Sequence, residues 1–386
     1  MKYYLLLGLL AAIVTFATVP LVRWAARKMG AITPVRERDV HTVPTPRLGG
    51  VAMLIGVAIG MAVASTIPFL RPIFGQGERG PWAVLGAGAL MCLLGAADDL
   101  WDLDWVTKLC GQVLAAGLLA WQGIQLITFP IAGLTVSSSR FSLMVTIIVV
   151  VVAINAVNFV DGLDGLAAGL VAIGAGAFFA YTYLLSVETG ASSYASLAAL
   201  ILALIVGVCV GFLPYNWHPS SIFMGDSGSM FLGLLFAAAT IAVTGQIDPL
   251  GAQRQAFPAF LPILLPVLVL ALPLLDVVLA VFRRVRSGKS PFHADRMHLH
   301  HRLLRLGHSQ RRAVLIMYLW TALVAVSGAA LAVFTARRVA VGFAVGFVLV
   351  ALFTLGVPRG RRNPAEKPGR SSSAGRRRSA FRANQL

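Results

Sequence analysis

Long apolar runs separated by short polar segments dominate the chain. A helix that crosses a bilayer needs about 20 mostly apolar residues, so each run predicts a membrane-spanning helix. The eleven predicted spans cover residues 3–22, 49–70, 82–97, 109–127, 142–160, 166–185, 195–213, 229–246, 258–281, 313–335 and 340–357. Pro130 and Gly133 interrupt the segment Ile124–Ser138, which predicts an extracytoplasmic loop, with a small hairpin as the alternative.

The composition excludes several other classes of protein. Of the 386 residues, 58% are hydrophobic and 12% are charged, against about 25% charged in soluble domains. A mean hydropathy of +0.81 excludes a water-soluble globule and a disordered chain. The three cysteines (Cys92, Cys110 and Cys209) are too few for a disulfide scaffold and lack metal-ligand spacing. Because lipid requires each span to satisfy its own backbone hydrogen bonds, we expect an all-α polytopic membrane protein, a bundle of about eleven helices.

The distribution of Lys and Arg predicts the orientation. With the N-terminus outside, the cytoplasmic segments hold 25 of the 32 basic residues. This asymmetry explains the net charge of +17 without a nucleic-acid partner, and we expect none. The first span lacks a small-residue cleavage site and ends in Arg23, Arg27 and Lys28, which favours a retained helix over a signal peptide. We therefore expect a multi-pass plasma-membrane protein.

The chain divides into two regions. Residues 1–357 are predicted to form a transmembrane domain, and residues 358–386 a basic, disordered cytoplasmic tail rich in Ser, Arg, Gly and Pro. The basic residues of the tail either act as a topology determinant or bind anionic lipid, at about 1 kcal/mol per basic residue near the surface. The sequence leaves both interpretations open.

Acidic residues are scarce, and seven of them lie on one side of the predicted topology. The chain has only 15 of them, and one at mid-bilayer costs about 2.5–3.5 kcal/mol or more. The seven are Asp98, Asp99, Asp102, Asp104, Asp161, Asp164 and Asp226. All seven fall on the cytoplasmic side of an orientation that depends on Lys and Arg alone. One polar site at that membrane face is therefore predicted.

Two loops near this face contribute basic and acidic groups. In Val35–Gly50, the side chains of Arg38, His41 and Arg47 can meet a phosphate, unless the segment is a plain juxtamembrane loop. In Gly95–Gln112, the pair Asp98 and Asp99 directly follows an apolar run. Because neighbouring carboxylates repel unless a cation sits beside them, this pair predicts a Mg²⁺ or catalytic site. Asp102, four residues after Asp98, could share its helix face, but Asp102 and Asp104 could equally solvate a loop.

The run Asn155–Gly169 places two amides and two carboxylates at the mouth of a span. Asn155, Asn158, Asp161 and Asp164 recur every three residues. They present donors and acceptors suited to the base and ribose of a nucleotide, or to a metal. The alternative is a polar contact between helices.

Before the eighth span, Asp226 is flanked by Gly225, Ser227 and Gly228. Such small neighbours allow a phosphate or a metal close to the carboxylate, and Phe223 could stack on a base. The alternative is that Asp226 only caps the helix.

Five of the seven histidines fall between Phe292 and Arg312, among many arginines. They are His293, His298, His300, His301 and His308. A zinc site is conceivable because His298 and His301 are three residues apart, but the surrounding positive charge opposes a dication. An anionic sugar-phosphate pocket fits the local charge better. Together with the carboxylates, which suit Mg²⁺, these loops predict phosphoryl chemistry at the inner membrane surface.

The ordered set of motifs resembles the polyprenyl-phosphate N-acetylhexosamine-1-phosphate transferases of glycosyltransferase family 4, from roughly Arg23 to the eleventh span. The matching motifs are the Asp-Asp pair with Lys108 and Gln112, the Asn-x-x-Asn-x-x-Asp-Gly-x-Asp-Gly run, the Phe-Met-Gly-Asp-Ser-Gly-Ser run and the Ala-Asp-Arg…His-Leu-His-His run. The final histidine run is most similar to the N-acetylglucosamine-1-phosphate branch.

The resemblance implies a reaction. A polyprenyl phosphate in the bilayer (undecaprenyl or decaprenyl) attacks the β-phosphate of UDP-GlcNAc, giving polyprenyl-diphospho-GlcNAc and UMP. This would be the first membrane step in the synthesis of an envelope polysaccharide. UDP-MurNAc-pentapeptide or another UDP-HexNAc is the alternative donor. The implied cofactor is Mg²⁺, with Mn²⁺ as an alternative, and a homodimer is a further partnership left open.

The resemblance also implies residue roles. Asp226 and Asp99 would bind the metal, and Asp98 or Asp99 would deprotonate or position the lipid phosphate. Lys108 would offset phosphate charge. The implied nucleotide and substrate contacts are Asn155, Asn158, Asp161, Asp164, Phe223, His298, His300, His301 and Arg302. A secondary transporter is the alternative from another class, although its polar site should lie near the midplane on broken helices.

Overall fold

A computed structural model describes residues 1–33, 44–75, 79–126, 138–188, 193–244, 286, 303, 306–331 and 333–356. Within these ranges the fold is helical apart from one two-stranded antiparallel sheet. The long helices are α1 (Lys2–Met29), α2 (Gly49–Thr66), α3 (Gly80–Trp101), α4 (Trp105–Trp121), α5 (Ser139–Val160), α6 (Leu166–Glu188), α7 (Ser193–Asn216), α8 (Gly225–Thr244), α13 (Gln310–Ala330) and α14 (Ala336–Leu355). A 3₁₀ helix, η1 (Pro68–Phe74), follows α2.

The predicted all-α membrane architecture is confirmed in the described part of the chain. Nine of its helices are long and apolar enough to cross a bilayer, and α4, with 17 residues, is a shorter apolar helix. These ten helices correspond to ten of the predicted spans. The ninth predicted span, residues 258–281, and the tail, residues 358–386, lie outside the described residues.

Two helix boundaries differ from the prediction in a way that matters for function. The third predicted span ended at residue 97, whereas α3 continues to Trp101 and contains Asp98 and Asp99. The eighth predicted span began at residue 229, whereas α8 begins at Gly225 and carries Asp226 in its first turn. An apolar run stops at the first charged residue, but a helix continues when neighbouring helices supply partners for the charge.

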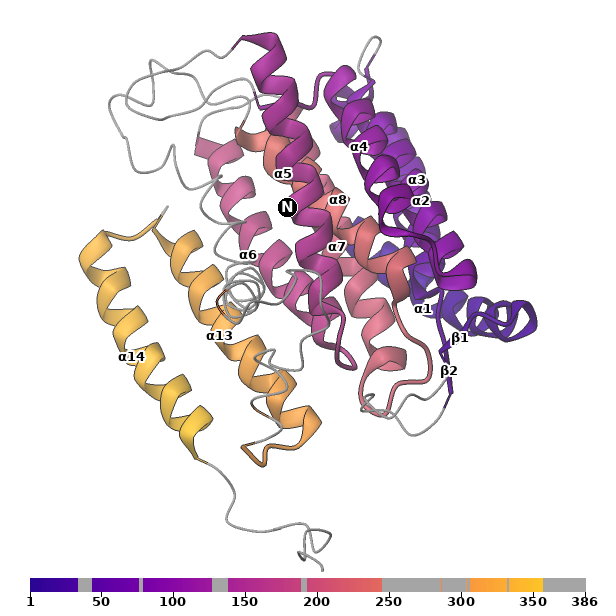
Figure 1. The fold of residues 1–386 in the computed structure, drawn as a ribbon. Helices are drawn as coiled ribbons and strands as arrows, with labels where there is room; N and C mark the ends of the chain where they lie inside the picture. The colour runs from indigo at the N-terminus through magenta and orange to yellow at the C-terminus, as the bar shows by residue number, and fades with distance from the viewer. Residues whose placement is uncertain are drawn as a thin grey trace, which may run out of the picture.

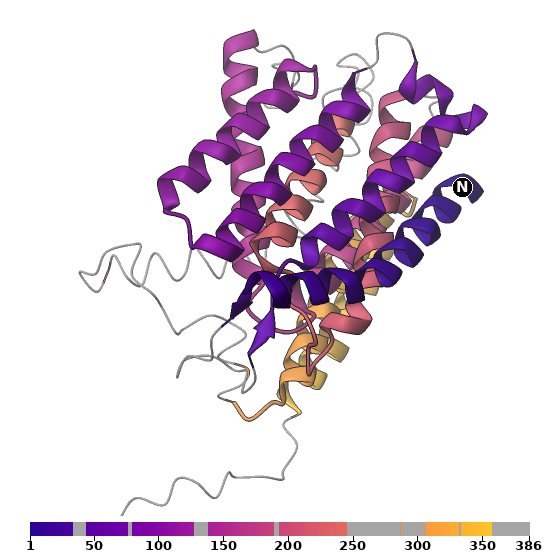
Figure 2. The same cartoon turned by 90° about the vertical axis from the view of Figure 1, so that its right-hand side faces the viewer.

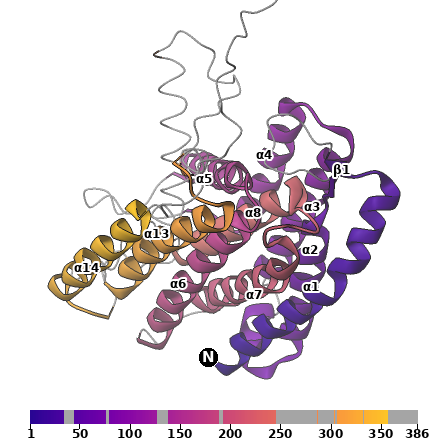
Figure 3. The ribbon, with the colours of Figure 1, turned by 90° about the horizontal axis from the view of Figure 1, so that it is seen from below.

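The helices surround α8, which lies near the centre of the bundle when it is viewed along its length (Figure 3). α8 packs against α2, α3, α5, α6 and α7, and 94% of the residues in its apolar stretch are buried. In α14 only 11% are buried, and this helix lies beside α13 at one edge of the bundle (Figure 1). Asp226 therefore stands at the first turn of the most enclosed helix.

A short β-hairpin lies at the end of the bundle where α1 ends (Figure 2). It consists of β1 (Ile32–Thr33) and β2 (Thr45–Pro46), with Thr33 opposite Thr45. Gly30 closes α1 in the left-handed conformation with φ 77°, which lets the chain turn directly into β1. We call this end of the bundle the pocket end, and the end where α1 begins the aromatic end.

Candidate active site

The first turn of α8 is held by a carboxylate from α3. Asp99 is completely buried, and its two oxygens accept hydrogen bonds from the backbone N–H groups of Asp226 (3.1 Å) and Ser227 (3.2 Å). A carboxylate in this place satisfies N–H groups that lack a partner within the helix and complements the positive end of the helix dipole. Asp99 thereby orients the backbone that carries Asp226.

This contact requires a glycine on each helix. A Cβ on Gly95 of α3 would lie 2.3 Å from the backbone of Asp226, and one on Gly225 would lie 2.3 Å from an oxygen of Asp99. Gly225 also has a φ of 70°, which side-chain-bearing residues rarely adopt. Of the small residues noted around Asp226, Gly225 therefore serves the close approach of α3 to α8, whereas Gly228 lies against Gly50 of α2.

Lys108 of α4 connects the other predicted carboxylates. Its Nζ donates to Asp98 at 2.9 Å and lies 3.5 Å from Asp226 Oδ2. Asp98 also accepts the backbone N–H of Leu103 at 2.8 Å, so the turn between α3 and α4 is tied to the same carboxylate. Lys108 thus supplies a positive charge beside Asp98 and Asp226, and the Mg²⁺ or catalytic role of the Asp98–Asp99 pair stays a prediction.

Asp102 and Asp104 lie apart from the pocket and are exposed. Asp102 follows α3 in a left-handed conformation with φ 54°, outside the helix, so the predicted helix face shared with Asp98 does not form. Asp104 accepts hydrogen bonds from Thr107 and Val106 as the N-cap of α4, and the bonds from Thr107 lower its pKa. The helix-capping role accounts for Asp104, and no catalytic or metal-binding role is needed to explain its presence.

The two asparagines of the α5 motif have different partners. Asn158 donates to Asp226 Oδ1 at 2.9 Å and lies 2.9 Å from Ser229 Oγ, so it belongs to the acidic site. Asn155 donates to the buried Gln112 of α4 at 2.7 Å. Asn155 therefore makes the polar contact between helices that was the alternative for this motif.

Loops 161–165 and 216–223 form the opposite wall of the site. The buried Asp164 contacts His218 Nδ1 at 2.7 Å and accepts from the hydroxyl of Ser220 at 2.9 Å. Asn216 accepts the backbone N–H of Gly165 at 3.0 Å. These contacts join the Asp-Gly-x-Asp-Gly loop to the segment that leads into Phe223.

Phe223 is also held by the hairpin. Its N–H donates to Pro46 O at 2.8 Å, and its carbonyl accepts from Gly49 N at 3.1 Å. Arg47, between these two residues, reaches the same space. Its Nε donates to Thr33 Oγ1 at 2.6 Å, and its Nη1 lies 3.8 Å from Asp99.

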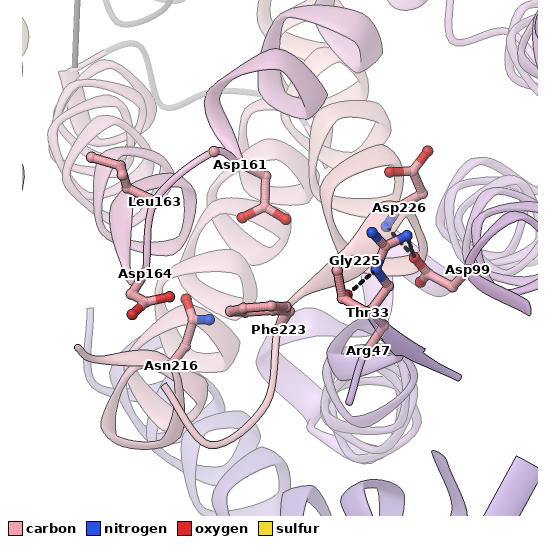
Figure 4. A pocket seen from close by; sticks show the side chains of 11 residues that line it. Thr33, Arg47, Asp99, Asp161, Leu163, Asp164, Asn216, Phe223, Gly225 and Asp226 are labelled. Carbon is pink, nitrogen blue, oxygen red and sulfur yellow. Dashed lines mark hydrogen bonds and ion pairs between the residues drawn. The ribbon is translucent and has the colours of Figure 1, made fainter. Parts of the chain in front are cut away.

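One cavity of about 260 Å³ opens between these segments (Figure 4). Its lining residues are Thr33, Arg47, Asp99, Asp161, Gly162, Leu163, Asp164, Asn216, Phe223, Gly225 and Asp226. Four of the seven acidic residues predicted to share one polar site line this cavity, and Lys108 joins Asp98 to its edge, whereas Asp102 and Asp104 lie apart. Thr33 and Asn216 were missed by sequence reasoning, because single uncharged polar residues give no charge or spacing signal.

Several predicted site residues lie outside the described part of the chain, namely Arg38, His41, His298, His300, His301 and Arg302. Of the clustered histidines, His308 is described. It is buried just before α13, and burial followed by the nearby Arg312 charge lowers its pKa.

The cavity carries more negative than positive charge. Among the described residues that line it, four are aspartates and one, Arg47, is a cation. Burial, and then the charges of Asp226 and Asp99, raise the pKa of Asp161 to about 8, although Arg47 opposes the shift. In Figure 4 the Asp161 carboxylate points into the space between Leu163 and Asp226, and the described residues offer it no hydrogen-bond donor.

This surplus of carboxylate oxygens fits a hard divalent cation. Within the described part of the chain, no group of three His, Cys, Asp or Glu side chains is arranged to hold a metal alone. Mg²⁺, however, is commonly held by one or two carboxylates together with substrate phosphates. Asp161 and Asp226 are the carboxylates best placed for that role, because Asp99 is engaged by two backbone N–H groups. The predicted metal role of Asp99 stays a prediction.

Comparison with known proteins gives matches over this same region. The model of the family described as glycosyl transferase family 4 matches residues 81–244, which include the acidic and asparagine motifs. A decaprenyl-phosphate N-acetylglucosaminephosphotransferase of Mycolicibacterium smegmatis is 44% identical, over 94% of this chain and 91% of its own. Its counterpart in Mycobacterium tuberculosis is also 44% identical, over 92% and 89%. A probable undecaprenyl-phosphate N-acetylglucosaminyl 1-phosphate transferase of Bacillus subtilis is 33% identical, over 80% of each chain.

Proposed function

The chain belongs to glycosyl transferase family 4, and from that premise we propose that it transfers GlcNAc-1-phosphate from UDP-GlcNAc to a polyprenyl phosphate. An oxygen of the acceptor phosphate forms a bond to the β-phosphorus of the donor. The bond from that phosphorus to the oxygen of UMP breaks, and UMP leaves with the electron pair. The products are polyprenyl-diphospho-GlcNAc and UMP. The observation that carries this proposal is the single cavity lined by Asp99, Asp161 and Asp226, in a chain 44% identical to enzymes named for this acceptor and sugar.

A divalent cation, Mg²⁺ or Mn²⁺, is part of this proposal. Asp226 and Asp161 would hold it, and Asn158 keeps Asp226 oriented by donating to one carboxylate oxygen. When bound, the cation would neutralise charge on the diphosphate. In phosphoryl transfer the protein does little covalent chemistry, so positioning of the substrates and stabilisation of their charge account for most of the rate enhancement.

The α3–α4 side of the site suits the lipid acceptor. Asp98 and Lys108 lie beside Asp226, and the turn between the two helices exposes Trp101 and Trp105, which are 72% and 71% accessible. Aromatic side chains of this kind gather where a bilayer meets water. An acceptor phosphate at headgroup level would meet Lys108 first, and Asp98 would receive or orient its proton.

The opposite wall suits the nucleotide. The ring of Phe223 offers a stacking surface, and Asn216 and Asp164 line the same wall with an amide and a carboxylate. Aromatic faces bind bases by stacking, and polar groups beside them read the base edge or the ribose. In this proposal the donor diphosphate lies between the nucleotide wall and Lys108.

We propose that the site faces the cytoplasm, where 25 of the 32 Lys and Arg residues are predicted to lie. The transporter alternative has less support, because the described polar residues converge at one end of the helices and not near their middle. A homodimer stays a prediction.

The test is a transfer assay on the purified full-length chain in nanodiscs. Radiolabelled UDP-GlcNAc, decaprenyl phosphate and Mg²⁺ should give labelled lipid and an equal amount of UMP, and EDTA should stop both. Asp226→Asn should fold but fail to turn over, whereas Asp104→Asn, a matched change at the exposed cap of α4, should retain activity. Full activity in Asp226→Asn would contradict the assignment. A panel with UDP-MurNAc-pentapeptide and UDP-GalNAc tests the choice of donor.

A further inference from the structure

Arg47 is the one cationic side chain among the described residues that line the cavity. It extends from the end of β2 and lies 3.8 Å from Asp99, with 35% of its side chain accessible. Its charge also acts on Asp161 across the cavity. The guanidinium therefore faces the place where a substrate diphosphate must sit if the acidic residues hold its counter-ion.

A neighbouring strand fixes the direction of this side chain. Arg47 Nε donates to the hydroxyl of Thr33 at 2.6 Å, and the backbone N–H of Arg47 donates to Ala31 O at 2.9 Å. Thr33 and Arg47 both line the cavity, and Figure 4 shows the bond between them at its edge. The hairpin thus holds Arg47 both through its backbone and through the inner nitrogen of the guanidinium.

The choice of nitrogen has a consequence for binding. A guanidinium has five N–H donors in a rigid fork. When Thr33 occupies Nε, Nη2 remains for an anion, while Nη1 lies 3.8 Å from Asp99, so the plane of the guanidinium is fixed before the ligand arrives. A donor that is already oriented loses less freedom on binding, which increases affinity without a new contact.

We propose that Thr33 is a positioning residue that aims the Arg47 guanidinium at the diphosphate of the nucleotide donor. This inference rests on the proposed function for the identity of the donor. Thr33 does not touch the reacting atoms. It acts through Arg47, so its loss should weaken donor binding more than it slows the chemical step.

The test replaces the Thr33 hydroxyl while keeping the shape of the side chain. Thr33→Val keeps a β-branched residue suited to a strand, and Thr33→Ser keeps the hydroxyl. We expect Thr33→Val to raise the KM for UDP-GlcNAc roughly 5- to 10-fold, the scale of one ordinary hydrogen bond, with kcat within about twofold. Thr33→Ser should restore most of the affinity. Thr66→Val is the matched control, because its hydroxyl bonds only to its own helix at Val63.

A double-mutant cycle tests whether the effect passes through Arg47. Arg47→Gln should raise the KM by itself, and Thr33→Val should add nothing in that background. An unchanged KM in Thr33→Val, or an equal additional loss in the Arg47→Gln background, overturns the proposal. If Thr33→Val does not fold, the comparison of Thr33→Ala with Thr33→Ser decides by the same criteria.

Calorimetric binding of UDP with Mg²⁺ separates this proposal from the proposed function. If the wild-type chain releases no UMP, the proposed function fails, yet weaker UDP binding in Thr33→Val than in wild type still supports the role of Thr33. Equal UDP affinity in the two proteins contradicts that role whether or not transfer occurs.

Discussion

The two ends of the bundle are held together by different kinds of interaction. At the aromatic end, the ring of Tyr4 on α1 lies 5.9–6.3 Å from those of Phe69, Phe179 and Tyr183, and the N-terminal amine of Met1 donates to Tyr183 at 3.0 Å. At the pocket end, charged and amide side chains make the contacts around the cavity, and a ring pair, Trp217 with Tyr318 at 6.3 Å, lies beside them. Offset and edge-to-face ring pairs each contribute about 0.5–1.5 kcal/mol beyond the area they bury, whereas neighbouring buried carboxylates oppose one another.

The difference indicates that stability and chemistry are divided between the ends. The aromatic end joins α1, η1 and α6 without a buried charge. The pocket end joins α3, α4, α5 and α8 through groups whose charges are only partly balanced. This division predicts four experimental outcomes of decreasing size.

Gly95→Ala should have the largest effect, because it removes both stability and activity at the pocket end. Its Cβ would lie 2.3 Å from the backbone of Asp226, so α3 and α8 must separate. We expect poor recovery of folded protein and no measurable transfer. Gly86→Ala on the same helix is the control, since nothing lies within 4 Å of its Cβ. Normal folding and activity in Gly95→Ala would contradict the close helix contact.

Asp99→Asn should reduce activity strongly with a smaller effect on folding. An amide offers one oxygen where Asp99 accepts from two backbone N–H groups, so the first turn of α8 loses part of its cap. We expect transfer to fall about 10²- to 10³-fold, the scale for losing preorganised electrostatics. Mn²⁺ binding in the presence of UDP, followed by electron paramagnetic resonance, should persist if Asp99 positions α8. Loss of that binding would instead support Asp99 as a metal ligand.

Tyr4→Ala should lower stability and leave the chemistry intact. Three ring contacts disappear, which should cost about 2 kcal/mol and lower the Tm. Transfer per folded molecule should match wild type. Tyr3→Ala, which removes one stacked pair with Phe69, should lower the Tm less. A large loss of specific activity in Tyr4→Ala would show that the two ends are coupled.

The smallest effect concerns the pH dependence of the metal-free protein. Folded Asp161 keeps its proton up to its pKa of about 8, while an unfolded chain releases it near the ordinary value of 3.8. Unfolding between these pH values therefore releases a proton, and stability falls as pH rises, by at most about 1.4 kcal/mol per pH unit. In EDTA, the Tm of wild type should decrease from pH 7 to 8, an effect of about 1 kcal/mol, more steeply than that of Asp161→Asn. Parallel curves would contradict the shifted pKa.

The spans and the convergence of the site could be predicted from the sequence, because both depend on patterns along the chain. An apolar run long enough to cross lipid must be a helix. Because carboxylates are costly in the membrane, the few that lie at one membrane face are expected to share one polar site. The ends of α3 and α8 could not be predicted this way. Their acidic residues remain helical because Lys108 and the backbone of α8 meet them, and those partners are remote in sequence.

The roles of individual polar residues also depended on remote partners. Asn155 and Asn158 stand in one motif with regular spacing, yet one meets Gln112 of α4 and the other meets Asp226 of α8. Thr33 and Asn216 contribute to the cavity through a hairpin and a loop with no repeating pattern. Which amide meets which helix is decided by the packing of the bundle, and spacing alone carries no such information.

The enclosure of α8 has a mechanical consequence. Membranes differ in hydrocarbon thickness, and helices adapt to the mismatch by tilting. Among the described helices, α8 packs against α2, α3, α5, α6 and α7 and cannot tilt without moving them, whereas α14 presents most of its surface to the surroundings. We therefore expect outer helices such as α14 to tilt when the lipid chain length changes, while Asp226 keeps its depth relative to Asp98 and Lys108.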